Sequence, residues 1–345
     1  MGKKLFTNCS IVNVIDKTVT PGSILTEDGV ITQVGDCPCA DGDAEVIDLN
    51  GGYVMPGLFN CHTHICMPPD PAVNYNRTDC QVTLLALDHL RQHLSTGVTF
   101  IRDGGGFNYI DIDLRNAARA GKITAPDMVV SGKCICMTGG HGWQMGREAD
   151  GADDCRKAAR EQLKAGADWI KVMGTGGVMT EGVEPGSPQL DEEELRAAIA
   201  EGHKVGAKSC THSQGMTGIK NALRAGVDSI EHGFYMDDWC FEWMKEHNVY
   251  YVPTLAAMYW IKVNGTAAGI PEYAVRKVNA TFDDHLNTFR NAYKAGVKIV
   301  LGTDAGTPFN RHDKTAYEMI LMTKAGMDVW DALRAGTITA AEMCG

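Results

Sequence analysis

One short phrase recurs along this 345-residue chain: a run of helix-forming residues closes on a glycine, and a short β-rich run follows it directly. The glycine suits the left-handed position that ends many helices, so each copy predicts a helix followed by a strand. Three further β-rich runs, 57–62, 127–136 and 249–254, bring the number of candidate strands to eight. The five copies of the phrase are STGVTFIRD, KAGADWIKV, KVGAKSCTH, RAGVDSIEH and KAGVKIVLGTD.

Eight strands that alternate with helices predict an α/β fold of the (β/α)8 TIM-barrel type, which needs about 250 residues. A doubly wound parallel sheet has the same alternation and is the alternative on the strand count alone. The dinucleotide-binding form of that sheet carries a Gly-x-Gly-x-x-Gly motif after its first strand. Here the glycine-rich stretches 104–106 and 174–177 follow later strands, so the barrel is favoured.

The first 55 residues follow a different pattern. Short β-rich runs are separated there by the turn signals Thr-Pro-Gly, Glu-Asp-Gly and Asn-Gly-Gly. These runs are 5–14, 23–26, 30–34 and 46–49. They predict a small antiparallel β domain over 1–55, and the barrel is expected over 56–345.

Composition argues against several classes of partner. Lys and Arg number 32 against 43 Asp and Glu, a net charge of −11, and no basic cluster is present to hold nucleic acid or an anionic membrane. The longest apolar run, 249–261, is broken by Pro253 and is shorter than the roughly 20 residues of a membrane helix. The 12 cysteines are scattered through apolar runs, so buried reduced thiols and a cytoplasmic location are expected.

Ligand-type side chains fall at the carboxyl ends of the predicted barrel strands, where barrel enzymes build their active sites. His62 and His64 end the first strand, and side chains two apart on a strand point to the same face, so this pair can chelate a metal. Three other strands each end with one such residue: His212, His232 and Asp304. A single residue of this kind is more often a satisfied polar group than a ligand. Together, at the ends of four strands, they indicate a metal site.

Lys171 lies inside the apolar run Asp-Trp-Ile-Lys-Val of the fourth barrel strand. A buried ammonium group without a partner is costly in free energy. A desolvated lysine can, however, react as a free amine. We therefore interpret Lys171 as a functional residue of the same site.

This set of a His-x-His pair, a fourth-strand lysine, two single histidines and an eighth-strand aspartate resembles the binuclear metal site of the amidohydrolase superfamily. The resemblance runs from Gly57 to the end of the chain. In that family the lysine is carboxylated by CO2 and bridges two metals, which are usually Zn²⁺ although other divalent ions are alternatives. The resemblance implies two metals bridged by carboxylated Lys171, one held by His62, His64 and Asp304 and the other by His212 and His232.

Three further motifs resemble the imidazolonepropionase-related branch of that superfamily, closest to its Xaa-Pro dipeptidases and zinc carboxypeptidases. They are Met137-Thr-Gly-Gly-His-Gly142, Lys171-Val-Met-Gly-Thr-Gly-Gly177 and His232-Gly-Phe-Tyr235. Imidazolonepropionases use one metal and lack the fourth-strand lysine, so Lys171 points away from their ring-opening reaction. The resemblance implies that His141 and Tyr235 contact the substrate carboxylate or the scissile carbonyl. A buried hydrogen-bonded histidine and a packed tyrosine are the structural alternatives.

The function that the resemblance implies is hydrolysis of an amide bond at a binuclear zinc centre. Two metals about 3.5–4 Å apart would share a water, lower its pKa and make hydroxide available at neutral pH. Asp304 would take the proton and pass it to the leaving amine. The expected substrates are dipeptides, Xaa-Pro or similar, or N-acyl amino acids. Because one barrel can host many chemistries, an amidase, lactonase or deaminase acting on another small molecule is the alternative, and a noncatalytic barrel scaffold is the third.

Signals for specificity are fewer. Arg147, Arg311 and His312 lie near predicted loop mouths, where solvated surface charge is the simpler interpretation. The expected partners are a small molecule with a free carboxylate and further copies of the chain, with no nucleic acid and no membrane. The resemblance also leads us to expect that further strands, beyond the segment 337–345, complete the N-terminal β domain as a sandwich. Without them, as in a fragment, that domain would have open sheet edges.

Overall fold

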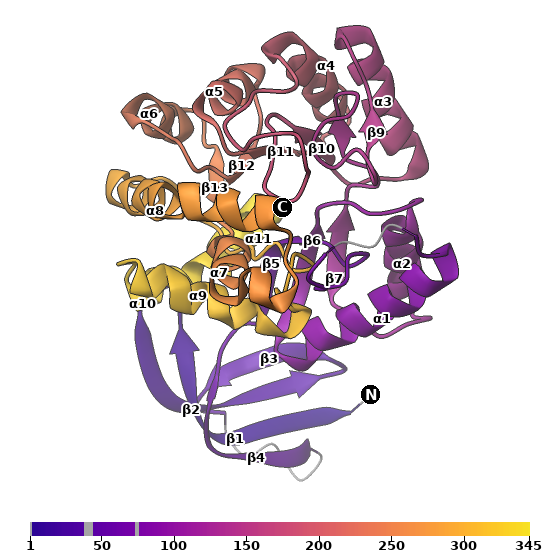
Figure 1. The fold of residues 1–345 in the computed structure, drawn as a ribbon. Coiled ribbons are helices and arrows are strands. Elements are labelled where there is room, and N and C mark those ends of the chain that lie inside the picture. Colours follow the sequence, from indigo (N-terminus) through magenta and orange to yellow (C-terminus); the bar gives the residue numbers. More distant parts are fainter. Residues whose placement is uncertain (1, 38–43, 73–75) are drawn as a thin grey trace. The chain divides into compact units, whose positions relative to one another are not determined.

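The computed structural model describes residues 2–37, 44–72 and 76–345, and the chain divides into two compact units, Met1–Gly57 and Leu58–Gly345. The first unit holds one four-stranded sheet (Figure 1). Its strands, in the sheet order β3-β2-β1-β4, are β1 (Lys3–Asn13), β2 (Thr18–Glu27), β3 (Val30–Gly35) and β4 (Ala44–Val54).

The pairing in this sheet differs from the predicted antiparallel arrangement at one edge. β1, β2 and β3 form an antiparallel meander, as the turn signals between them predict. β4 instead pairs with β1 in parallel. The reason is that the chain crosses from β3 at one edge of the sheet to β4 at the other, and does not turn back beside β3. Turn signals identify hairpins, but they cannot identify such a crossing.

The second unit alternates strands with helices, and all ladders between its described strands are parallel. One sheet has the order β5-β6-β7, from β5 (Leu58–Thr63), β6 (Val98–Asp103) and β7 (Asp127–Val130). The other has the order β13-β12-β11-β10-β8-β9. Its strands are β8 (Ile135–Cys136), β9 (Arg147–Glu148), β10 (Ile170–Met173), β11 (Ser209–Ser213), β12 (Ser229–His232) and β13 (Tyr250–Val252).

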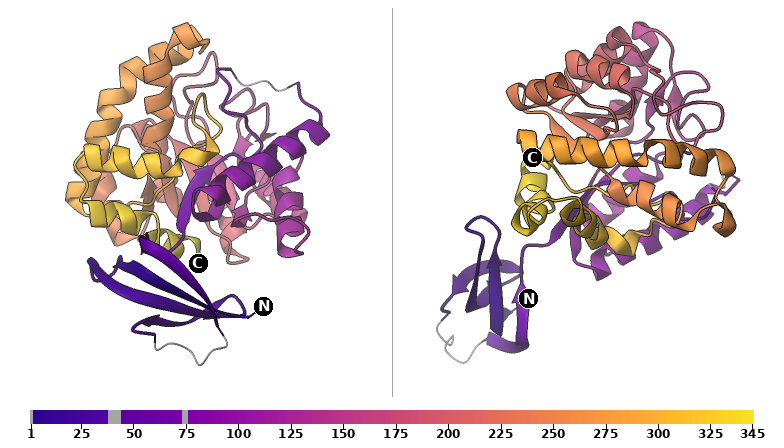
Figure 2. Two further views of the ribbon diagram at one scale, coloured as in Figure 1. Left: turned by 90° about the horizontal axis from the view of Figure 1, so that it is seen from below. Right: turned by 60° about the vertical axis from the view of Figure 1, so that its left-hand side comes forward.

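The helices of this unit lie around its strands (Figure 2). The repeated phrase is confirmed at α3, α5 and α8, which end on Gly166, Gly226 and Gly296 with φ of 106°, 91° and 80°. The helices are α1 (Asp79–Ser95), α2 (Ile110–Arg119), α3 (Ala152–Ala165), α4 (Glu192–His203), α5 (Met216–Ala225), α6 (Asp238–Glu246), α7 (Leu255–Asn264), α8 (Glu272–Ala295), α9 (Thr315–Lys324), α10 (Val329–Ala335) and α11 (Ile338–Cys344), with 3-10 turns η1 (Thr266–Ala268) and η2 (His312–Lys314).

Two predicted strands differ in detail. The run 127–136 is divided into β7 and β8, because Gly132 adopts a left-handed φ of 70° between them. The last predicted strand, around 298–304, forms no regular ladder, although it is hydrogen-bonded on both sides. It reaches β13 through a bridge between Ile299 and Tyr251 and reaches β5 where the amide of Cys61 donates to the carbonyl of Leu301. This α/β arrangement is consistent with a TIM barrel.

The alternation along β10 explains why a lysine stands in an apolar run. Ile170 and Val172 are fully buried in the main apolar core, which joins the strands to their helices. Lys171, between them, points to the opposite face because successive side chains of a strand alternate. That face holds the site described below. No helix within the described ranges is long and apolar enough to cross a membrane.

Candidate active site

Two histidines at the end of β5 have their protonation fixed by their hydrogen-bond partners. His62 Nδ1 donates to Glu231 Oε2 at 2.6 Å, and His64 Nδ1 donates to the carbonyl of Gly105 at 2.9 Å. A carbonyl and a carboxylate can only accept, so the proton of each neutral ring lies on Nδ1. Both rings therefore have the lone pair of Nε2 free.

Two histidines on the neighbouring strands are fixed in the same way. His232 Nδ1 lies 2.7 Å from the hydroxyl of Thr254, and that hydroxyl donates its own hydrogen to the carbonyl of Pro253. It must therefore accept from His232, whose Nε2 keeps its lone pair. His212 Nε2 donates to the carbonyl of Gly176 at 3.3 Å, which leaves the lone pair on Nδ1. Four imidazoles thus each commit one N–H to the protein and keep one nitrogen for a ligand.

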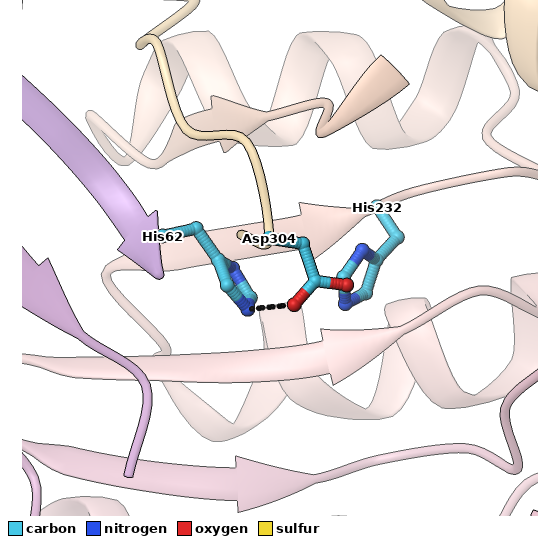
Figure 3. Close-up of side chains that lie close together, drawn as sticks. All are labelled: His62, His232 and Asp304. Atoms are coloured by element: carbon cyan, nitrogen blue, oxygen red, sulfur yellow. Dashed lines mark ion pairs between the residues drawn. The ribbon is translucent and has the colours of Figure 1, made fainter. Parts of the chain in front are cut away.

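Asp304 lies among these rings. Its Oδ1 is 3.5 Å from His62 Nε2 and 3.4 Å from His64 Nε2. Figure 3 shows the carboxylate between the rings of His62 and His232, and donor atoms of these three residues lie within 4.8 Å of one another. Asp304 and His232 have left-handed φ angles of 59° and 72°. Positive φ angles are uncommon outside glycine, although aspartate and histidine adopt them more readily than most residues, and such positions cluster at functional sites.

Burial keeps the imidazoles of this site neutral. Burial first, and then the charge of Lys171, lowers the pKa of His62 to about 3 and that of His64 to about 4. Burial and the neighbouring histidines hold the pKa values of His212 and His232 well below the ordinary value. Burial also raises the pKa of Asp304 to about 7, against the opposing effect of the Lys171 charge. Neutral imidazole is the form that binds a metal.

Lys171 reaches the same place from β10. Its side chain is 1% exposed, and its Nζ has no hydrogen-bond partner among the residues that the structure describes. Its described surroundings therefore lack a group that would satisfy the amine. A buried amine without such a partner is costly in free energy. Four free imidazole lone pairs, one carboxylate and one unsatisfied amine in a single cavity are a donor set that fits a divalent metal ion.

A buried ion-pair network behind His62 is absent from the sequence predictions. Glu231 Oε1 accepts from Arg102 Nη2 at 2.7 Å and from the Ser229 hydroxyl at 2.6 Å, and Arg102 Nε donates to the carbonyl of Cys61 at 2.6 Å. Burial alone would raise the pKa of Glu231, but the Arg102 charge and the His62 hydrogen bond outweigh it and lower that pKa. The signal that identified Lys171, a charge inside a β-rich run, is also present in Thr-Phe-Ile-Arg-Asp and Ser-Ile-Glu-His.

We expect Glu231→Gln to weaken metal binding by about 10- to 100-fold, the usual effect of losing a carboxylate that orients a ligating histidine. The neutral amide no longer balances Arg102 and no longer requires a proton on His62 Nδ1. Competition with a chelator would measure the affinity. Glu201→Gln is the matched control, because Glu201 also accepts from an arginine, Arg160, but outside the site. Unchanged metal affinity in Glu231→Gln would show that His62 is oriented without this carboxylate.

The two predicted substrate-contact residues lie in different surroundings. His141 lines the cavity, with its ring centroid 4.2 Å from that of His212 and its Nδ1 2.8 Å from the hydroxyl of Thr180. Tyr235 is half-buried beside Asp284, and burial together with that carboxylate raises its pKa. Tyr235 is not among the described residues that line the cavity.

The three candidates near the loop mouths do not line this cavity in the described part of the chain. Arg147 is paired with Asp154, and Arg311 with Asp313. His312 is not a surface charge, because it is fully buried. Its Nε2 donates to the backbone carbonyl of His64 at 3.2 Å, so it supports the β5 end from behind.

Fold and site together define a class of protein: an α/β chain with a histidine and aspartate metal site at the carboxyl ends of parallel strands. The model of the amidohydrolase family matches residues 53–345. This chain belongs to the amidohydrolase family.

Individual relatives agree with this membership. Ochratoxinase from Aspergillus niger is 32% identical over 322 residues, which cover 83% of this chain and 64% of that protein, so the chain spans less than two-thirds of that relative. A crystal structure of a Xaa-Pro dipeptidase with bound methionine has a TM-score of 0.90 at 29% identity, covering 99% of this chain and 88% of the other. A prolidase complexed with N-methylphosphonate-L-proline has a TM-score of 0.91 at 27% identity, covering 99% and 87%.

Proposed function

We propose that this chain hydrolyses the amide bond of a dipeptide, Xaa-Pro or similar, or of an N-acyl amino acid, at a centre of two zinc ions. The observation that carries the proposal is the set of four histidines, each with one lone pair free, around Asp304 and the unsatisfied Lys171. The methionine and the proline phosphonate bound to the two structural relatives support an amino-acid-like substrate.

In this proposal His62, His64 and Asp304 hold one metal, His212 and His232 hold the other, and Lys171 bridges them as a carbamate. The ammonium group first loses one proton, and the free amine then joins its Nζ to the carbon of CO2 and releases a second proton. An unpaired buried cation would thereby become an anion whose charge the proposed divalent metals would balance, which would remove the cost described above. Divalent metals bound there would supply Lewis-acid polarisation of the scissile carbonyl and a water of lowered pKa.

The chain's own residues then supply proton transfer and orientation. Asp304 would accept a proton from the attacking water and return it to the leaving amine, because its carboxylate lies in the cavity beside the imidazoles of His62 and His64. His141 would hydrogen-bond the substrate carboxylate or carbonyl, with the Thr180 hydroxyl fixing its ring from the other side. Tyr235 would need to turn from Asp284 to share that role.

The proposal also includes the architecture. We infer one closed (β/α)8 barrel over 56–345 with the segment 298–304 as its eighth strand, and a separate β domain over 1–55. Hydrogen bonds from this segment to both β13 and β5 support closure. Completion of the β domain as a sandwich by further strands stays a prediction, as do assembly into a homo-oligomer and a cytoplasmic location.

Metal analysis tests the centre directly. We expect about two zinc ions per chain after purification without chelators. Removal of the metal should abolish hydrolysis of a panel of Xaa-Pro dipeptides and N-acyl amino acids, and added Zn²⁺ should restore it. Fewer than about one zinc per chain, or hydrolysis that survives complete removal of metal, would contradict the proposal.

A further inference from the structure

One wall of the cavity is apolar. Its residues come from the loop after β10, from the end of β12 and from α7. Four of them are at most 5% exposed and pack in one apolar cluster, and the fifth, Met179, is half-buried against it. We call this set the apolar wall: Val178, Met179, Phe234, Met258 and Ile261.

The cavity offers little to a charged group. The only Lys, Arg, Asp or Glu side chains among its described lining residues are Lys171 and Asp304, and the proposed function already uses both. A charged substrate side chain at the apolar wall would therefore be buried without a partner, which is strongly unfavourable. Apart from the histidines, the other polar side chains that line it are Thr180, Gln214 and Thr307, which carry no charge.

We propose that the apolar wall binds a large uncharged apolar group next to the scissile amide, so that the substrates are amides with an aromatic or long aliphatic side chain. This inference rests on the proposed function, since it names the substrate class of the same site. Methionine side chains adapt to irregular shapes, and their sulfur makes favourable contacts with aromatic rings. Met179 and Met258 in the wall favour such a group over a small or a charged one.

Lys277 holds one part of the apolar wall in place. Its side chain is 2% exposed, and its Nζ donates to the carbonyls of Thr180 at 2.7 Å, Val183 at 2.5 Å and Gly177 at 3.1 Å. These carbonyls belong to the loop that carries Val178 and Met179. Ala274, three residues before Lys277 on α8, packs in the same apolar cluster. Lys277 is therefore a positioning residue for the wall.

Two matched substrate series test the inference. One series is Phe-Pro, Leu-Pro, Gly-Pro, Asp-Pro and Lys-Pro, and the other is the N-acetyl derivatives of Phe, Leu, Gly, Asp and Lys. In at least one series kcat/KM for the Phe and Leu members should exceed that of the Gly, Asp and Lys members by about tenfold or more. Equal rates for apolar, small and charged members in both series would overturn this inference but not the proposed function. No hydrolysis of any member by the zinc-loaded protein would instead count against the proposed function.

Variants connect this preference to the wall. Met258→Ala should lower the ratio of kcat/KM between the Phe and Gly members by about tenfold, with the bound metal unchanged. Met179→Ala, at a less buried position, provides a second variant if Met258→Ala does not fold. Met319→Ala is the control, because Met319 on α9 packs on the main core and should keep the ratio. An unchanged ratio in the wall variants would overturn the inference.

Lys277→Met tests the positioning role, because methionine keeps much of the length of the side chain and removes its three donors. We expect KM for the preferred apolar substrate to rise about tenfold, with kcat and metal content nearly unchanged, since the loop would lose its position while the metal ligands keep theirs. A fall in kcat together with loss of metal, at unchanged KM, would overturn this role.

Discussion

An Asp304→Asn variant is expected to fold, to bind substrate and to lose about 10²- to 10⁴-fold in kcat, the usual contribution of a general base. Asparagine has nearly the same shape as aspartate and can keep an oxygen toward the histidines, but its amide cannot take a proton. Burial raises the pKa of Asp304 to about 7, which means that the folded protein disfavours the ionised carboxylate. Replacing it with a neutral amide should therefore not lower the stability of the metal-free protein. Single-turnover hydrolysis would measure the chemical step, and thermal unfolding would measure folding.

The matched control is Asp313→Asn. Asp313 is paired with Arg311 and is not among the described residues of the cavity, so this variant should keep nearly full activity. Metal content must be measured for both variants, because Asp304 is also a proposed ligand. If Asp304→Asn keeps its metal and more than about a tenth of the activity, another group takes the proton.

The candidate ligands could be grouped from the sequence because most of them obey a local rule. His62 and His64 are two apart on a strand, His212 and His232 each end a β-rich run, and Lys171 interrupts an apolar one. The parallel fold then brings the strand ends together. Knowledge of the class of fold was therefore sufficient to group these residues, without any knowledge of individual contacts.

The groups that fix these ligands could not be predicted, because they depend on contacts between distant strands. Glu231 reaches His62 across 169 residues of sequence, and its partner Arg102 comes from a third strand. Whether Glu231 or its neighbour faces His62 depends on strand register, which no local pattern gives. The same limit applies to Lys277, because two of its carbonyl acceptors lie 100 and 97 residues away, in a loop.

The parallel pairing of β4 with β1 has a similar cause. The alternation within β4 is compatible with either direction, and only the path of the chain across the sheet decides between them. Local sequence therefore specified that a strand forms, while long-range pairing determined its neighbour and its direction.

The second large effect is expected for Lys171→Ala. The substitution removes the amine that would carry the bridging carbamate, and it leaves a space beside the imidazoles where Nζ has no other partner in the described structure. We expect loss of at least one of the two metals and a fall in kcat of about 10²-fold or more. A short carboxylic acid such as acetate or propionate, added at millimolar concentration, should partly restore metal and activity, because its carboxylate can occupy the place of the carbamate.

Rescue separates the bridging role from a merely structural one, since a destabilised core would not recover on addition of a small anion. Lys220→Ala is the control, because Lys220 pairs with Asp237 away from the cavity and its loss should change neither metal content nor activity. In the wild-type protein, ¹³C-labelled bicarbonate should give a carbamate signal that Lys171→Ala lacks. A variant that keeps two metals and full activity would exclude the bridge, and a wild-type protein without the carbamate signal would show that Lys171 contributes as a plain amine.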